Sequence, residues 1–220
     1  MAASLLFAVS CEKDPENNGG NENGPEDNPS GYLEAVDMGT GVLWASCNVG
    51  AYSAEEPGNY YAWGDTEVRT DYSWESYKFS TELHDGIHFT KYNDPSAKLD
   101  SGDDVARAVL GEPWRMPTVE EFSALKEKCT WTWEKRGNQE GYLVTSKSTN
   151  ASIFLPAAGS IVSGNKVSAK NYFGKYWTNE LRSDTPGLAN NFTFTNSNIA
   201  PDSYPYRYLG FSVRAVRSAK

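Results

Sequence analysis

Few residues of this chain have the types and spacing that enzymes use for catalysis. His84 and His88 are four residues apart, as two zinc ligands on one helix face would be. Gly86 between them disfavours a helix, and the residue after the first histidine is not the glutamate that a metalloprotease needs. The two imidazoles therefore do not predict a zinc site.

The acidic and glycine-rich patterns also fall short of a catalytic or metal site. Asp100, Asp103 and Asp104 could offer oxygen ligands to calcium, but the calcium-binding loop with glycine at its sixth and glutamate at its twelfth position is absent. Helix capping is the better interpretation of these aspartates. The pattern at 39–41 lacks the lysine of phosphate-binding loops, and no Gly-x-Ser-x-Gly motif occurs. We therefore expect no enzymatic activity, no metal and no cofactor.

Residues 196–208 carry the side chains of a recognition surface. This stretch of thirteen residues holds three tyrosines, several asparagines and serines, and one arginine. Tyr gives a large amphipathic contact area with few torsions to freeze, and Ser and Asn give adaptable hydrogen bonds, which is the mixture that antibody loops use. A plain hairpin loop needs far fewer residues. The alternative is a solvated loop whose tyrosine rings pack back onto the domain.

Short strands and two helices must position this loop. Thr118 and Glu121 form a capping-box pattern that predicts a helix over 118–128, while Asp103 and Gly111 predict a shorter helix over 103–110. Strands are predicted over 42–47, 60–63, 130–133, 142–145, 152–155, 172–177, 191–195 and 209–216. Apolar residues alternate in 191–195 and in 211–215, so each strand has one buried face and we expect the two to pair. The class is α+β, with short twisted antiparallel strands and long loops.

The composition is that of a folded protein without a nucleic-acid partner. Of the 220 residues, 39% are apolar and 13% aromatic, which is too rich for a disordered chain. The formal net charge is −9, from 20 Lys and Arg against 29 Asp and Glu, and no basic cluster is present to neutralise phosphates. Trp44, Trp63, Trp114 and Trp177 could be sugar-stacking platforms, but core positions are the favoured interpretation.

The first thirty residues predict export and a lipid anchor. Residues 3–10 are an apolar stretch that ends in small residues directly before Cys11, which resembles a bacterial lipobox whose cysteine is acylated. Residues 12–30 hold six carboxylates against one lysine among Asn, Gly and Pro, which is typical of a disordered acidic linker. We expect a signal segment at 1–11, this linker at 12–30 and one domain, a monomer, at 31–220. The alternative is a cytosolic N-terminus with a chance cysteine.

Export would place the two remaining cysteines in an oxidising compartment. Cys47 and Cys129 are an even number there, and a disulfide closing so long a loop would stabilise the fold by about 4 kcal/mol in the chain-entropy model. We therefore expect this disulfide. The alternative is two separately buried thiols, because free Cys packs as a small hydrophobe.

Six ordered motifs connect the chain to a known family. They are the segments 41–51 (with Trp44-Ala45-Ser46-Cys47), 58–66 (with Trp63-Gly64-Asp65-Thr66), 114–118 (Trp114-Arg115-Met116-Pro117-Thr118), 153–159, 176–178 and 210–214. In this order they resemble the motifs of the Fibrobacter succinogenes major paralogous domain family of gut bacterial lipoproteins, over residues 32–217. The resemblance implies a C-type-lectin-like fold of the formylglycine-generating-enzyme type. The C-terminal catalytic cysteines of that enzyme have no counterpart here, which agrees with a protein that is not an enzyme.

The C-terminus carries a narrower resemblance. The pattern from Tyr176-Trp177-Thr178-Asn179 to Arg207-Tyr208-Leu209-Gly210-Phe211 is similar to the variable region of retroelement-diversified proteins, where exposed Asn, Asp, Ser, Tyr and Thr bind ligand on a fixed scaffold. By this resemblance Phe192, Phe194, Phe211 and Val213 would be scaffold. The ligand-facing residues would be Asn179, Asn190, Asn191, Thr193, Asn196, Asn198, Asp202, Ser203, Tyr204, Tyr206 and Tyr208.

These observations predict a function in binding. We expect a surface-exposed, lipid-anchored display domain of the outer membrane that binds a protein or glycan ligand through the face formed by 177–208. The alternative is a structural subunit of a cell-envelope or fimbrial assembly, in which the same face docks one fixed partner.

Overall fold

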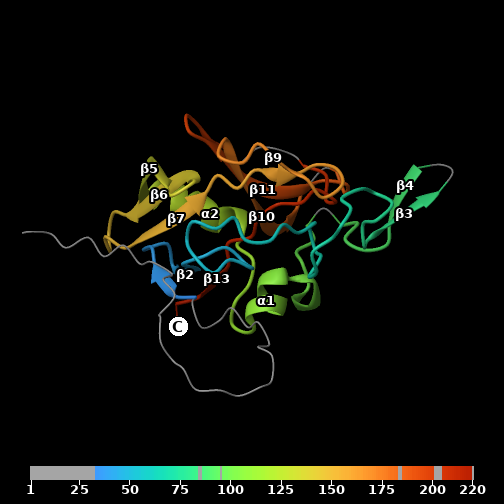
Figure 1. The fold of residues 1–220 in the computed structure, drawn as a ribbon. Coiled ribbons are helices and arrows are strands. Elements are labelled where there is room, and N and C mark those ends of the chain that lie inside the picture. Colours follow the sequence, from blue (N-terminus) through green and yellow to red (C-terminus); the bar gives the residue numbers. More distant parts are fainter. Residues whose placement is uncertain (1–32, 84–85, 95, 183–184, 201–204, 220) are drawn as a thin grey trace, which may run out of the picture.

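The computed structural model describes residues 33–83, 86–94, 96–182, 185–200 and 205–219. Cys11, the linker, and Asp202, Ser203 and Tyr204 lie outside these ranges. The described chain is α+β: mostly antiparallel strands in small sheets, with two α-helices (Figure 1). None of its helices has the length and apolar character needed to cross a membrane.

The strands form five small sheets within the described residues. The first joins β1 (Ala35–Asp37), β2 (Val42–Ala45) and β13 (Val216–Ser218), so strands from the two ends of the domain pair. The second joins β5 (Cys129–Arg136), β6 (Gln139–Ser146) and β7 (Ser152–Pro156). The third joins β10 (Phe173–Leu181), β11 (Ala189–Thr195) and β12 (Ile199–Ala200). The two hairpins are β3 (Ser80–Leu83) with β4 (Gly86–Phe89), and β8 (Ser160–Ile161) with β9 (Val167–Ser168).

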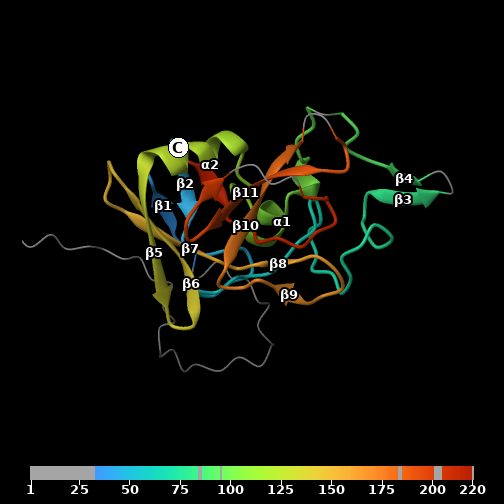
Figure 2. The same cartoon turned by 90° about the horizontal axis from the view of Figure 1, so that it is seen from above.

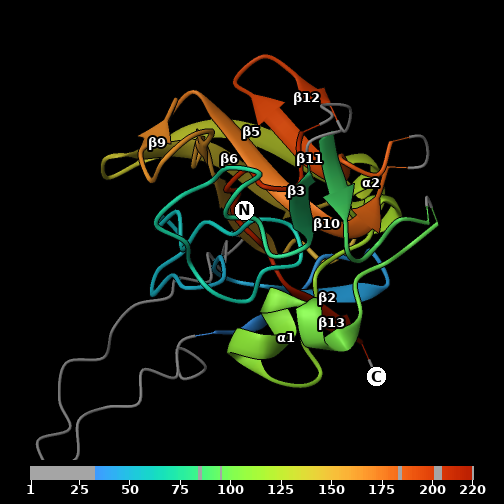
Figure 3. The same cartoon turned by 90° about the vertical axis from the view of Figure 1, so that its right-hand side faces the viewer.

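The views show how these parts are arranged. The β3–β4 hairpin projects from the body of the domain in Figures 1 and 2. Figure 3 shows the sheet β10–β11–β12 on one side of the body, with β2 and β13 on another.

Both predicted helices are present, and their caps follow from the sequence. In α2 (Val119–Lys128) the Thr118 side chain accepts from the Glu121 backbone while the Glu121 side chain accepts from the Thr118 backbone, so the predicted capping box is confirmed. The shorter helix α1 (Val105–Leu110) is capped by Asp104, whose carboxylate accepts from two backbone amides of its first turn. The prediction that Asp103 begins this helix is wrong, because Asp103 belongs to a preceding 3-10 helix, η2 (Ser101–Asp103).

The strand predictions hold wherever a strand pairs with a neighbour along the chain. Those over 42–47, 130–133, 142–145, 152–155, 172–177 and 191–195 overlap β2, β5, β6, β7, β10 and β11, with ends that differ by up to four residues. Residues 60–63 make only an isolated bridge, from Tyr61 to Phe211. The predicted pairing of 191–195 with 209–216 is wrong. β11 lies between β10 and β12, and Gly210, Phe211, Ser212 and Val216 form isolated bridges to four different segments. The cause is central burial, because Phe211 to Val216 are fully buried and contact more than one sheet.

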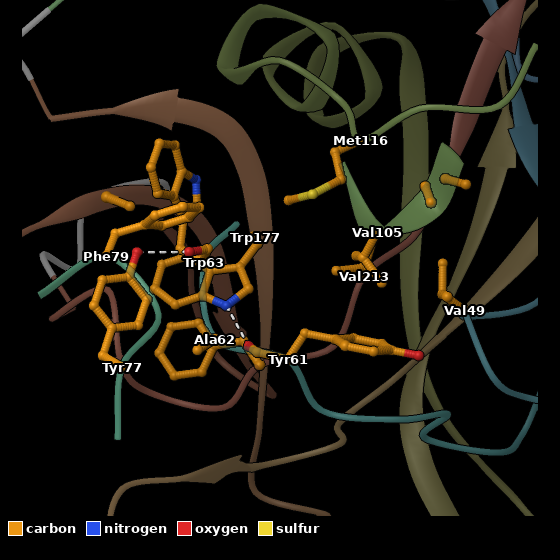
Figure 4. Close-up of a cluster of buried hydrophobic side chains, with 14 of the residues drawn as sticks. Val49, Tyr61, Ala62, Trp63, Tyr77, Phe79, Val105, Met116, Trp177 and Val213 are labelled. Carbon is orange, nitrogen blue, oxygen red and sulfur yellow. Dashed lines mark hydrogen bonds between the residues drawn. The ribbon is translucent and has the colours of Figure 1, made fainter. Parts of the chain in front are cut away.

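The sheet β10–β11 separates two hydrophobic clusters. Tyr176, Phe192 and Phe194 face one cluster, against α2 and the sheet β5–β6–β7, and the neighbouring Trp177 faces the other. In Figure 4 the Trp177 indole donates to the Tyr61 carbonyl oxygen, at 2.7 Å. This alternation is what a strand with side chains on both faces requires. The four tryptophans weighed as sugar platforms, at 44, 63, 114 and 177, are all buried, so the core interpretation is confirmed.

The predicted disulfide between Cys47 and Cys129 is wrong. Cys129 is a free, buried thiol at the start of β5, and its sulfur contacts the Met38 carbonyl oxygen at 3.8 Å. It packs in the cluster of α2 and the sheet β5–β6–β7, whereas Cys47 packs with Ala51 in a separate small cluster. Cys47 is disulfide-bonded whereas Cys129 is free, so the two are not each other's partners. Burial raises the pKa of the Cys129 thiol to about 11.

Candidate functional site

The structure places the described candidate ligand residues at two ends of one strand. Asn190 is the second residue of β11, and Tyr206 lies near this end of the strand through a bridge to Leu188. Asn196 and Asn198 are exposed in the turn between β11 and β12, at the other end of that strand. Thr193 is half-buried midway along it. The predicted face is thus an elongated surface along β11 and not one compact patch.

Three consecutive residues after Pro205 alternate between surface and core. Tyr206 is 51% exposed, Arg207 is fully buried, and Tyr208 is half-buried. This segment joins the domain through backbone bonds at Arg207, whose N–H donates to the Gly187 carbonyl and whose own carbonyl accepts from Trp63. Residues 206–209 form a turn, closed by a hydrogen bond from the Leu209 N–H to the Tyr206 carbonyl. The turn places the Arg207 side chain inside the domain, leaves Tyr206 on the surface, and packs Tyr208 partly against the core.

The buried guanidinium of Arg207 binds main-chain oxygens and one phenol. Its Nη1 donates to the carbonyls of Tyr92 and Pro186, at 2.9 and 2.8 Å, and its Nη2 donates to the Lys91 carbonyl at 3.1 Å. Its Nε donates to the Tyr77 hydroxyl, at 3.1 Å. The charge also lies 4.4 Å from the centre of the Phe89 ring. Arginine suits this position because its fork of five donors can satisfy several acceptors at once.

Outside the buried guanidinium lies a group of rings that we call the tyrosine platform: Trp74, Tyr206 and Tyr208. The two tyrosine rings stack with centroids 5.6 Å apart and planes at 11°. Trp74 meets Tyr208 edge-on at 4.7 Å and Tyr206 at 5.6 Å. Edge-to-face and offset-stacked pairs are the favoured aromatic geometries, so the rings hold one another in place.

The platform has an acidic neighbour. Burial, then the neighbouring Tyr206 and Glu75, raise the pKa of Tyr208, so its hydroxyl is protonated and available as a donor at neutral pH. Sequence reasoning missed Trp74 in this group, because it lies more than 130 residues from Tyr208 along the chain and no local pattern marks it.

The asparagines of the candidate set are partly structural. The Asn190 amide donates to the Leu181 carbonyl at 2.8 Å, and Asn191 is only 2% exposed, with its amide donating to the Thr193 hydroxyl at 2.7 Å. The expectation that Asn191 is an exposed contact residue is therefore wrong for the free protein. Asn179 is half-buried, and its side-chain oxygen is a buried acceptor that has no hydrogen-bond partner in the described part of the chain.

One hollow on the described surface involves a candidate residue, and a second does not. The first, of about 230 Å³, is lined by Ser96, Ala97, Val119, Glu120, Glu180, Leu181 and Asn190. Glu180 there accepts from the Val119 amide at the start of α2 and pairs with Lys98, so its charge is compensated. The second, of about 390 Å³, is lined by residues 65–69 and Lys78. It contains the Asp65–Arg69 ion pair and no candidate residue.

The aspartates considered for calcium have other partners. Asp103 accepts from Lys78, Lys91 and the Tyr92 hydroxyl at 2.5–2.6 Å. Burial opposes its ionisation, but these three hydrogen bonds outweigh burial and lower the Asp103 pKa to about 2. Among the described residues no group of three potential metal-ligating side chains is found. The capping interpretation is confirmed for Asp104 and is wrong for Asp103, which is an ion-pair centre.

The site thus defined is an aromatic and hydroxyl-bearing surface on a small α+β domain. No protein-family model, no curated protein and no solved structure matches the chain.

Proposed function

We propose that this chain is a non-enzymatic, lipid-anchored display domain that binds a protein or glycan ligand through the surface from β10 to Tyr208. The observation that carries the proposal is the turn at 206–209, where a fully buried arginine lies in sequence between two tyrosines whose rings stack, and Tyr206 is 51% exposed. Rings held in this way lose little conformational entropy when a ligand binds.

We further propose a C-type-lectin-like fold and membership of the Fibrobacter succinogenes major paralogous domain family. The ordered motifs support this proposal. The small antiparallel sheets, the two helices and the long connections are compatible with it. The anchor is proposed on Cys11 and the apolar stretch before it, and the location is the outer membrane, facing outward. Replacing Cys11 by Ser in the full-length precursor would abolish incorporation of labelled palmitate if the proposal is right.

The binding proposal is tested with Tyr206→Ala/Tyr208→Ala on printed glycan and protein arrays. Each buried aromatic contact at an interface contributes about 1–3 kcal/mol, so the double variant should lose at least tenfold in affinity for wild-type hits. Its melting temperature should stay within a few degrees, because Tyr206 is 51% exposed and Tyr208 packs against the core only in part. Tyr52→Ala is the matched control, because Tyr52 is 47% exposed in the segment after β2.

Unchanged binding by the double variant would refute the proposal. A collapse of the melting temperature would show that the rings are structural, as in the alternative of a solvated loop packed onto the domain. Binding to a single envelope protein of the same cell, and to nothing else, would favour the structural-subunit alternative.

A further inference from the structure

Lys175 lies on the face of the sheet β10–β11 opposite Tyr176 and Phe192. It is paired directly with Thr193, and cross-strand partners project to the same face. Asn191 reaches the same face, because its amide bonds the Thr193 hydroxyl. Two of the candidate ligand residues therefore share a face with a lysine that sequence reasoning did not select.

The ammonium group of Lys175 has no carboxylate within ion-pair distance in the described chain. Its neighbours are instead two rings, with the nitrogen 5.1 Å from the centre of Phe173 and 5.2 Å from that of Phe211. The lysine is half-buried, and this burial lowers its pKa. The electrostatic attraction between an anion and a partly desolvated cation is stronger than that to a fully solvated lysine, because the effective dielectric around the cation is lower.

The segment around this lysine is free of acidic residues. Residues 141–179 include Lys147, Lys166, Lys170 and Lys175 but no Asp or Glu, although the whole chain is acidic. Lys166 and Lys170 are exposed around the β8–β9 hairpin, and this hairpin is joined to β10 by the bridge between Gly159 and Gly174, next to Lys175. Without acidic residues to offset them, these lysines give the segment 141–179 a positive charge.

We propose that Lys175 binds the carboxylate of an acidic sugar. The inference rests on the proposed function and narrows its ligand to a carboxylated glycan. One compact ammonium group suits one carboxylate, and the hydroxyls of Thr193 and Thr195 suit the hydroxyls of a sugar ring. Tyr172, which is 71% exposed two residues before Gly174, offers a ring on which a sugar can stack. An acidic protein segment would gain more from planar, bidentate arginines, and no arginine occurs in residues 141–179.

The test uses three acidic oligosaccharides, each with a neutral counterpart: oligogalacturonate and its methyl ester, a hyaluronan hexasaccharide and its methyl ester, and sialyllactose and lactose. Isothermal titration of the full domain at low salt should show at least one acidic probe binding tenfold or more tightly than its neutral partner. Lys175→Met, which keeps the aliphatic stem, should lose this preference, and Lys175→Arg should retain it within about threefold. Lys147→Met is the matched control, because the Lys147 ammonium donates to the Glu127 carbonyl, away from this face.

Three outcomes would overturn the inference: no acidic probe preferred over its neutral counterpart, a preference that survives in Lys175→Met, or an equal loss in Lys147→Met. If the domain binds neutral and acidic sugars equally well and Tyr206→Ala/Tyr208→Ala loses this binding, the inference about Lys175 is refuted while the proposed function is still supported. Thermal unfolding of Lys175→Met within a few degrees of wild type shows that a loss is not misfolding.

Discussion

Replacing Arg207 by Met tests whether one buried cation holds the tyrosine platform in place. Met fills much of the same volume but removes the donors to three backbone carbonyls and to the Tyr77 hydroxyl. Each buried acceptor left without its donor costs about 1–3 kcal/mol. The rings around the guanidinium recover part of this loss by packing on the apolar Met side chain. At the lower bound for four acceptors, we expect the free energy of unfolding to fall by about 4 kcal/mol.

The assay is urea unfolding followed by tryptophan fluorescence. With a slope of about 2 kcal/mol per molar urea, the loss corresponds to a midpoint lower by about 2 M. At urea concentrations where the variant is still folded, it should also bind more weakly than wild type to any probe that requires Tyr206 and Tyr208.

Arg136→Met is the control for removing an arginine as such. The half-buried Arg136 guanidinium pairs with Glu134, and such an ion pair near the surface contributes about 1 kcal/mol or less to the free energy of unfolding. If Arg207→Met shifts the midpoint no more than Arg136→Met does, the buried arginine does not anchor the segment and does not hold the tyrosine platform in place.

Three further predictions concern the core and the charged network. Phe194→Ala should lower the free energy of unfolding by about 3–5 kcal/mol in the same assay, because this ring is buried between the sheet of β10 and β11 and the sheet of β5, β6 and β7. A loss below about 1 kcal/mol would contradict that placement. With its pKa raised to about 11, the Cys129 thiolate is about a hundredfold scarcer than at the ordinary value of 9.0, so iodoacetamide should alkylate it far more slowly in native than in urea-unfolded protein, as mass spectrometry would show; equal rates would refute its burial. Because the pKa of Asp103 is lowered from 3.8 to about 2, the stability it contributes is present above about pH 4 and is lost as the pH falls toward 2. Asp103→Asn should therefore flatten the dependence of the free energy of unfolding on pH in this interval, and an unchanged slope would show that the three hydrogen bonds do not act on its ionisation.

The sequence by itself determined the elements that depend on neighbours along the chain. Thr118 and Glu121 specify the start of α2 because a capping box is closed within four residues. The alternation of Phe192 and Phe194 with polar residues specifies the buried face of β11 because side chains of a strand alternate with a period of two. The aromatic composition and the tyrosines near the C-terminus were likewise visible without coordinates.

Only the tertiary structure decided which distant segments meet. Residues 209–216 read as a strand with one buried face, yet residues 211–216 are fully buried and the segment bridges several others instead of pairing with β11. Cys47 and Cys129 are the two cysteines of the predicted domain, but they pack in different clusters and are not bonded to each other. Trp74 joins Tyr206 and Tyr208, and Lys175 meets Phe211, across long stretches of chain. Such contacts are selected by packing of the whole core and by the carbonyls that a buried arginine can reach, and neither leaves a local pattern in the sequence.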